Sequence, residues 1–151
     1  MPNWCYNRIT IYGDSETEAK LKEIEEIFEK ADPFNQIFPI PDFKNIPDEK
    51  GELPKLEQKL NPDGSVFYET YNFSDGTNDD RWYHWCIANW GTKWEPDIAD
   101  IEYADSEQLQ LTFSTAWSPP EGIVEKLRER YPELSFQCFY DEPGMESAGY
   151  Y

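Results

Sequence analysis

Side chains that could form a ligand site are concentrated between residues 82 and 94, which hold four of the six tryptophans and the only histidine. Each Trp or Tyr can bury roughly 150–250 Å², and ligand pockets commonly combine aromatic walls with a few polar groups. The cluster is therefore either a pocket or part of a core in which polar neighbours satisfy the buried indole N–H groups. The pocket interpretation takes in Trp4, Asn7, Trp82, His84, Trp85, Asn89, Trp90, Lys93, Trp94 and Trp117.

The same residues give little support to catalysis. A histidine acting as general acid or base needs a partner that orients it, and no Ser-His-Asp or Cys-His order is recognisable around His84. Residues 61–65 are similar to a calcium loop, but Val66 and Asn72 stand where an EF-hand requires glycine and glutamate. We read this segment as a Pro-Asp-Gly turn. We assign no catalytic residue, no metal and no cofactor, and we favour a non-enzymatic role.

Carboxylates form the second candidate site. The chain has 31 acidic and 13 basic residues, a net charge of −18. Such a charge disfavours nucleic-acid backbones and anionic membranes and attracts basic proteins. One stretch without Lys or Arg forms an acidic stripe, either a solvated edge that resists aggregation or a phosphate-like surface for a basic partner. The stripe comprises Glu95, Asp97, Asp100, Glu102, Asp105 and Glu107.

Hydrophobic periodicity predicts the elements that position these residues. Residues 8–12 alternate as a half-buried strand, and a capping box at Ser15 and Glu18 predicts a helix to about residue 30. A short helix is expected over 80–89, with Gly91 just past its end. Residues 98–103 and 109–114 read as two strands joined by a turn. A second capping box at Ser118 starts a helix that Pro132 ends, and residues 134–140 form a last strand.

Side-chain alternation assigns faces to the two middle strands. Leu109 and Phe113 share one face of the later strand. On the earlier strand, Asp100 and Glu102 point the same way, opposite Tyr103. The carboxylates of this strand are therefore expected on the solvent side.

Proline interrupts the pattern after the first helix. Six of the twelve prolines lie between residues 32 and 80, where they disfavour long helices and central strands. We expect an irregular insertion at about 32–94, lying across the domain, with a mobile portion near residues 45–65.

The predicted order is β-α-insertion-β-β-α-β in one domain spanning 1–151. Two such β-α-β halves sharing an antiparallel sheet make an α+β, ferredoxin-like split sandwich. Both helices are expected on one face of the sheet, with the other face open or covered by the insertion.

Four motifs spread along the chain resemble one family. They are residues 1–8 (MPNWCYNR), 89–94 (NWGTKW), 115–120 (TAWSPP) and 142–145 (EPGM). Together they are similar to the YubB-like group of plasmid- and phage-borne proteins with a ferredoxin-like domain. The resemblance implies that fold and residence on bacterial mobile DNA. It implies no catalytic residue, because that group carries no settled activity.

Cysteine usage and hydropathy suggest the compartment. Cys5, Cys86 and Cys138 are not spaced as a metal pair or a redox motif. The simplest interpretation is that they are reduced thiols in a cytosolic protein. No signal peptide and no run of ~20 apolar residues is visible. We therefore expect a protein of the bacterial cytoplasm.

The leading hypothesis is a non-enzymatic acidic protein of a phage or plasmid that binds a basic host or defence protein, as a nucleic-acid mimic in its sharpest form. The alternative is a small-ligand domain or an uncharacterised enzyme that uses the Trp/Asn/His pocket. Direct nucleic-acid binding by sheet aromatics is disfavoured because no basic groove is visible. The partner's identity, the oligomeric state and the order of residues 45–65 stay open.

Overall fold

The computed structural model describes residues 2–151. The predicted strands and helices occur in it in the predicted order, together with further elements. The full set is β1 (Trp4–Tyr12), α1 (Glu18–Glu29), α2 (Pro33–Ile37), η1 (Phe43–Asn45), β2 (Lys55–Leu60), β3 (Val66–Asn72), α3 (Arg81–Asn89), β4 (Asp100–Ala104), β5 (Gln108–Ala116), α4 (Glu121–Arg130), β6 (Ser135–Glu142), η2 (Pro143–Met145) and β7 (Ser147–Tyr150). The chain forms two compact units. The sheet unit comprises Met1–Pro39 with Trp85–Tyr151, and the hairpin unit comprises Ile40–His84.

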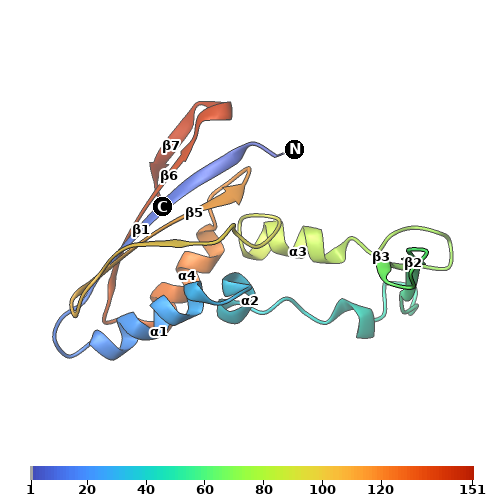
Figure 1. The fold of residues 1–151 in the computed structure, drawn as a ribbon, viewed down its shortest axis with the longest axis horizontal. Helices are drawn as coiled ribbons and strands as arrows, with labels where there is room; N and C mark the ends of the chain where they lie inside the picture. The colour runs from blue at the N-terminus through green and yellow to red at the C-terminus, as the bar shows by residue number, and fades with distance from the viewer. Residues whose placement is uncertain (1) are drawn as a thin grey trace. The chain divides into compact units, whose positions relative to one another are not determined.

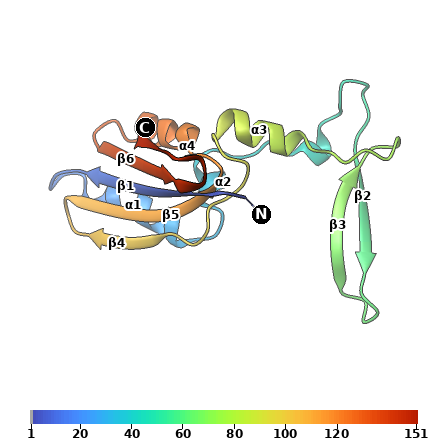
Figure 2. The same cartoon turned by 90° about the horizontal axis from the view of Figure 1, so that it is seen from above.

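The sheet unit is built on a five-stranded antiparallel sheet in the order β4-β5-β1-β6-β7 (Figure 2). β1 lies at its centre, between β5 and β6. Both α1 and α4 lie on the same face (Figure 1). Without β7, this is the strand order of two interlocked β-α-β halves, and the expected ferredoxin-like α+β fold is confirmed.

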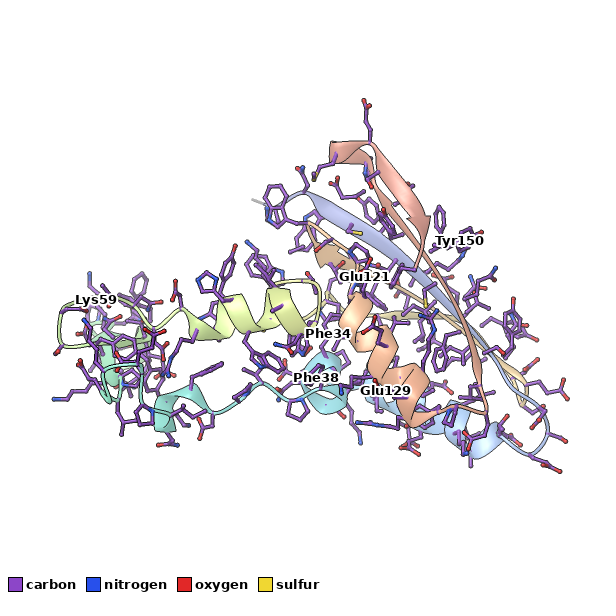
Figure 3. All side chains as sticks on the ribbon, turned by 180° about the vertical axis from the view of Figure 1, so that it is seen from behind. Phe34, Phe38, Lys59, Glu121, Glu129 and Tyr150 are labelled. Atoms are coloured by element: carbon purple, nitrogen blue, oxygen red, sulfur yellow. The ribbon has the colours of Figure 1, made fainter. Side chains whose placement is uncertain are left out.

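The core fills the space between the sheet and its helices. Leu109, Leu111 and Phe113 alternate with half-exposed residues along β5 and are buried, as their spacing predicts. Phe34 of α2, labelled in Figure 3, lies edge-on to Phe113. It also contacts Trp90, which is 1% exposed. Aromatic surface therefore supplies much of the hydrophobic stabilisation of this unit.

A β-bulge corrects the predicted faces of β4. Asp100 pairs with Thr112 and Ile101 with Leu111, but Tyr103 then pairs with Gln110, and the register shifts between Ile101 and Tyr103. One extra residue reverses the alternation beyond it. Tyr103 consequently shares the solvent face with Asp100, and the prediction that it lies opposite was wrong.

Both predicted capping boxes were also wrong in detail. The N-cap of α1 is Thr17 rather than Ser15, and its side chain bonds the backbone of Asp14. The N-cap of α4 is Pro120, while Ser118 donates its hydroxyl to the Gly91 carbonyl. For α4, a neighbouring loop takes the side chain that the pattern assigns to the helix cap.

The hairpin unit is more regular than expected. β2 and β3 pair antiparallel as a separate two-stranded sheet. The turn at residues 61–65 is closed by a bond from the Asn61 N–H to the Ser65 carbonyl, with Gly64 at φ +89°. Periodic burial is absent because both faces of this hairpin are largely exposed, so the sequence pattern did not reveal it. The short strand β7 was missed as well.

Candidate functional site

The face of the sheet opposite α1 and α4 carries the candidate site. Strand register places Asp100, Thr112, Arg8, Phe139 and Tyr150 side by side in one row across all five strands. The neighbouring row contains Ser114, Tyr6 and Asp141. Acidic and aromatic side chains therefore share this face with polar residues and one arginine, and we call it the open face.

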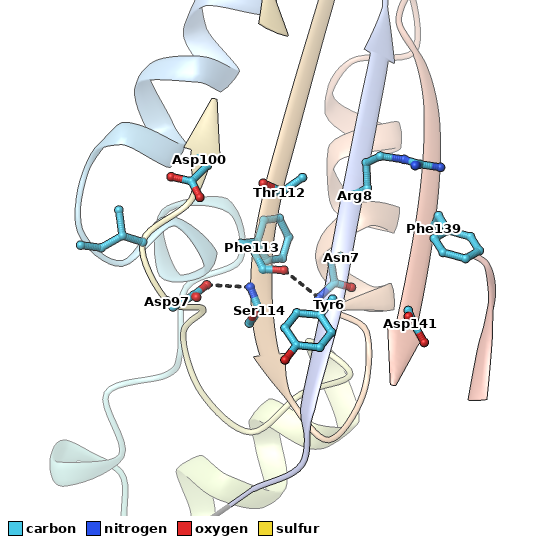
Figure 4. Close-up of a pocket in the computed structure, with 11 residues that line it drawn as sticks. Tyr6, Asn7, Arg8, Asp97, Asp100, Thr112, Phe113, Ser114, Phe139 and Asp141 are labelled. Carbon is cyan, nitrogen blue, oxygen red and sulfur yellow. Dashed lines mark hydrogen bonds between the residues drawn. The ribbon is translucent and has the colours of Figure 1, made fainter. Parts of the chain in front are cut away.

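A shallow hollow of about 400 Å³ lies on the open face (Figure 4). Carboxylates stand on both sides of it, and an exposed tyrosine and isoleucine contribute apolar surface. Tyr6 is 54% exposed and Ile98 is 91% exposed. The lining residues are Tyr6, Asn7, Arg8, Asp97, Ile98, Asp100, Thr112, Phe113, Ser114, Phe139 and Asp141.

Arg8 supplies the cation within the hollow, and its side chain points away from Asp100. The Arg8 guanidinium lies 5.4 Å from the centroid of the Phe139 ring, and Figure 4 shows the side chain directed toward that ring and away from Asp100. Among the described residues Arg8 forms no ion pair. Asp97 accepts a hydrogen bond from the Ser114 N–H at 2.6 Å, which fixes its position. The arrangement suits an incoming cationic group with an apolar stem.

The structure divides the predicted acidic stripe into two parts. Asp97, Asp100 and Glu102 belong to the open face, where Glu102 accepts a hydrogen bond from the Thr112 hydroxyl at 2.8 Å. Asp105 accepts backbone bonds from Glu107 and Gln108 and so closes the β4–β5 turn. The hydroxyl of Tyr103 also donates to Asp105 and lowers the pKa of its carboxyl.

Glu95 has a structural position away from the open face. Its two carboxylate oxygens accept hydrogen bonds from the N–H groups of Phe34 and Asn35, at the start of α2. Burial raises the pKa of Glu95 to about 7 in spite of these bonds. Its carboxylate is therefore engaged within the sheet unit. Glu107, the last residue of the stripe, is exposed at the β4–β5 turn.

Four residues of the predicted aromatic pocket are tied into the packing and hydrogen bonds of the sheet unit. Trp90 belongs to the core, and its indole N–H donates to the Phe38 carbonyl at 2.8 Å. Trp85 packs edge-on against Trp90, and its carbonyl accepts a bond from the Asn89 amide. Asn7 is buried in a polar network, bonding Thr115 and the hydroxyl of Tyr151.

The remaining members of that set are largely exposed. In the sheet unit, Lys93 lies over the Trp94 ring at 4.0 Å, and Trp4 and Trp117 are 39% and 44% exposed. In the hairpin unit, Trp82 lines a separate hollow. His84 lies 3.3 Å from the Asp80 carboxylate, with its side chain 69% exposed.

Nucleophile and metal chemistry find little support in the described residues. Cys5, Cys86 and Cys138 are buried and unpaired, and burial raises the pKa of each thiol to about 11. Within residues 2–151 no group of three or more His, Cys, Asp or Glu side chains is placed to hold a metal ion. None of the described helices is long and apolar enough to cross a membrane.

Eight of the eleven residues that line the hollow were missed as site residues from the sequence, and four of them carry aromatic or charged groups on the open face. Arg8 and Phe139 lie within predicted strands, whereas Tyr6 precedes the predicted strand at residues 8–12. Only the strand register brings the three onto one face with Asp100. Asp141 is uncompensated in the sequence and pairs with Tyr6 across β1 and β6. The signal available in the sequence was that every second residue of β1 faces away from the helices. Together with the strand order of a ferredoxin-like sheet, this alternation places those residues beside the outward residues of β5 and β6.

Fold and site together define a ferredoxin-like domain with an acidic, partly aromatic open face. Residues 89–151 match the family model described as the ferredoxin-like domain in Api92-like protein. The crystal structure of the protein Api92 from Yersinia pseudotuberculosis is similar to the chain with a TM-score of 0.53 and 11% identity, covering 99% of this chain and 93% of that one. At that identity the likeness concerns the fold alone. The search of curated proteins finds no match.

Proposed function

We propose that the chain is a non-enzymatic binding protein whose open face holds a basic segment of another protein. The observation that carries this proposal is the hollow in which Asp97, Asp100 and Asp141 stand around the exposed ring of Tyr6 and the side chain of Ile98. Lysine and arginine side chains have an apolar stem and a cationic head. The carboxylates would take the head, and Tyr6 with Ile98 would take the stem.

The position of Arg8 supports this choice of ligand. Its guanidinium already lies over Phe139, so the open face accommodates a guanidinium beside an aromatic ring. Asp100 and Asp141 make no ion pair with any described residue, and both are exposed. An incoming cation would therefore meet carboxylates that need no rearrangement to receive it.

Charge favours a basic protein over a nucleic acid. Ferredoxin-like domains that bind RNA stack bases on aromatic residues of the sheet, and Tyr6 and Phe139 could do so. However, a net charge of −18 repels phosphates at every approach. A basic partner would instead be steered to the domain, and its association would slow as salt rises.

The biological setting is part of the same proposal. The resemblance to the YubB-like group supports a phage or plasmid origin and a place in the cytoplasm of a bacterial host. There, an acidic protein that occupies the basic groove of a host or defence protein would act as a nucleic-acid mimic. Of the predicted stripe, Asp97, Asp100 and Glu102 would supply the phosphate-like charges.

The test measures binding of a short peptide rich in arginine and lysine to an Asp100→Asn/Asp141→Asn variant. Exposed ion pairs contribute about 0.2–1 kcal/mol each, so the double change should raise Kd roughly 2- to 30-fold. Glu26→Gln/Glu125→Gln is the matched control, because both glutamates are exposed on the helices of the opposite face. Equal weakening by the control would reduce the effect to net charge and reject the site.

Two further measurements identify the ligand. A single-stranded RNA oligonucleotide should not bind, and RNA binding that is lost in Tyr6→Ala would replace the proposal with base stacking. Capture from bacterial lysate at low and then moderate salt should recover a basic protein with the wild-type chain. Recovery should fall with the Asp100/Asp141 variant.

A further inference from the structure

The hairpin unit exposes a strand edge that no other part of the described chain pairs. β2 and β3 form a two-stranded sheet, and an isolated hairpin of this kind is marginally stable in water. Leu56, Leu60 and Phe67 are nevertheless 45%, 56% and 65% exposed. Apolar side chains on an unpaired edge favour association, and the question is with what.

The backbone groups that face the free edge of β2 can be identified from both ends of the hairpin. The Tyr71 carbonyl accepts the Asp79 N–H on the outer side of β3. Its partner Leu56 must therefore turn its own N–H and C=O outward, because the two residues of a non-hydrogen-bonded pair both point away. The Asn61–Ser65 bond fixes the same alternation at the other end. The residues with outward backbone groups are Leu56, Gln58 and Leu60.

We infer that β2 pairs with β2 of a second copy of this chain, antiparallel and with Gln58 on the two-fold axis. In this register Gln58 faces its own copy and Leu56 faces Leu60 of the other chain, so the outward backbone groups of both strands meet. Glu57 faces Lys59 of the other chain, and symmetry repeats that pair. The result is a four-stranded sheet in the order β3-β2-β2-β3.

Charge selects this register over its neighbours. Moving the axis to Glu57 would place that residue opposite itself and Lys55 opposite Lys59. Moving the axis to Lys59 would place that lysine opposite its own copy. Like charges directly opposite destabilise a sheet. Of the registers that centre on Glu57, Gln58 or Lys59, the one on Gln58 alone joins opposite charges.

The groups that make the contact are available. Lys59, labelled in Figure 3, forms no ion pair within the described residues. Glu57 accepts the Asn72 amide at 2.8 Å through one carboxylate oxygen, which holds the side chain beside the strand and leaves the other oxygen for a lysine. Strand Lys55–Leu60 also contains two lysines and one glutamate, so it lacks the acidic excess that would drive two copies apart elsewhere.

The shared edge is bounded at both ends of β2, and part of the outer edge of β3 is already bonded. Pro54 precedes β2 and Pro62 follows it, so the shared edge cannot lengthen. On the outer edge of β3, Tyr71 and Phe73 already bond Asp79 and Thr77. A two-fold contact of this type uses the same surface on both copies and therefore gives a dimer.

The experiment measures molar mass by light scattering and by sedimentation over a wide range of protein concentration. Wild type should reach twice the mass of one chain. Glu57→Lys and Lys59→Glu should each raise the dimer dissociation constant at least about tenfold, because each turns two attractive pairs into repulsive ones. Glu57→Lys/Lys59→Glu should dimerise as wild type does.

Mixing the two single variants gives the sharpest outcome, since all four charges of a mixed pair are again complementary. A heterodimer should form from two chains that are monomeric alone. Lys55→Glu is the control, because it makes the same charge change opposite the uncharged Asn61. A wild type that stays monomeric, single variants that dimerise as tightly as wild type, a mixture that associates no better than either variant alone, or an equal loss in the control would each overturn the inference. The peptide test on the open face is independent of all four results.

Discussion

Replacing Trp90 distinguishes a core from a ligand pocket. The side chain is 1% exposed, and its ring lies 5.6 Å from Phe34 and 6.1 Å from Trp85. Truncating a buried tryptophan to alanine costs about 3–5 kcal/mol. The whole free energy of unfolding of a domain of this kind is about 5–15 kcal/mol. We therefore expect Trp90→Ala to lose a large share of the free energy of unfolding.

Trp90→Phe separates the hydrogen bond from the ring. It keeps an aromatic side chain but leaves the part-buried Phe38 carbonyl without the indole N–H, a loss of about 0.5–1.5 kcal/mol for a typical hydrogen bond. Trp117→Ala is the comparison, since that residue is 44% exposed and surface substitutions usually stay within about 0.5 kcal/mol.

Urea unfolding followed by far-ultraviolet circular dichroism gives the three free energies. The expected order of cost is Trp90→Ala, then Trp90→Phe, then Trp117→Ala. If Trp90→Ala unfolds at the same urea concentration as wild type, the tryptophan is not part of the core and the packing argument fails.

Two other residues give predictions that concern stability. Burial raises the pKa of Glu95 to about 7 from 4.5. The contribution of Glu95 to the free energy of unfolding is therefore fully present below about pH 4.5 and is lost as pH rises through 7. Glu95→Gln should flatten that part of a plot of unfolding free energy against pH. A Cβ on Gly122 would lie 1.6 Å from the Asn89 carbonyl oxygen, so Gly122→Ala should cost about 3 kcal/mol or more in urea unfolding. Glu125→Ala, exposed on the same helix, should leave the urea midpoint almost unchanged. A Gly122→Ala chain as stable as that control would contradict the close packing at Gly122. A Glu95→Gln chain with the wild-type pH slope would contradict the raised pKa of Glu95.

Much of the ferredoxin-like sheet could be predicted because its strands are buried on one side only. β5 alternates polar and apolar residues with period two from Gln108 to Ser114, and that pattern needs no knowledge of its neighbours. The bulge at Glu102 could not be predicted in this way, because it is a property of how β4 meets β5 rather than of either sequence. The β2–β3 hairpin escaped for a related reason. Because both of its faces are largely exposed, its sequence shows no alternation of apolar and polar residues that would indicate a strand.

The candidate site divides along the same line. Asp97 and Asp100 were recognisable as uncompensated charges, since charge is visible in one dimension. Tyr6 and Phe139 join them only through pairing across β1, β5 and β6. Glu95 belongs to the same acidic run but accepts hydrogen bonds from the start of α2. The sequence around Glu95 gives no sign of this distant partner.

The tryptophan-rich motifs describe how the fold is joined more than what the open face binds. The end of α3 and the start of α4 interlock, with the Gly122 N–H bonding the Trp90 carbonyl at 3.0 Å. The Thr92 hydroxyl donates a hydrogen bond to the Ala116 carbonyl. Gly91, at φ +89°, lies so close to the Pro119 carbonyl that a Cβ would reach 2.9 Å from its oxygen. These residues are constrained by packing, whereas Asp100 and Asp141 on the open face are exposed. Chains that share the motifs can therefore share this fold and still differ in the charge of the open face, which under the proposed function would select the partner.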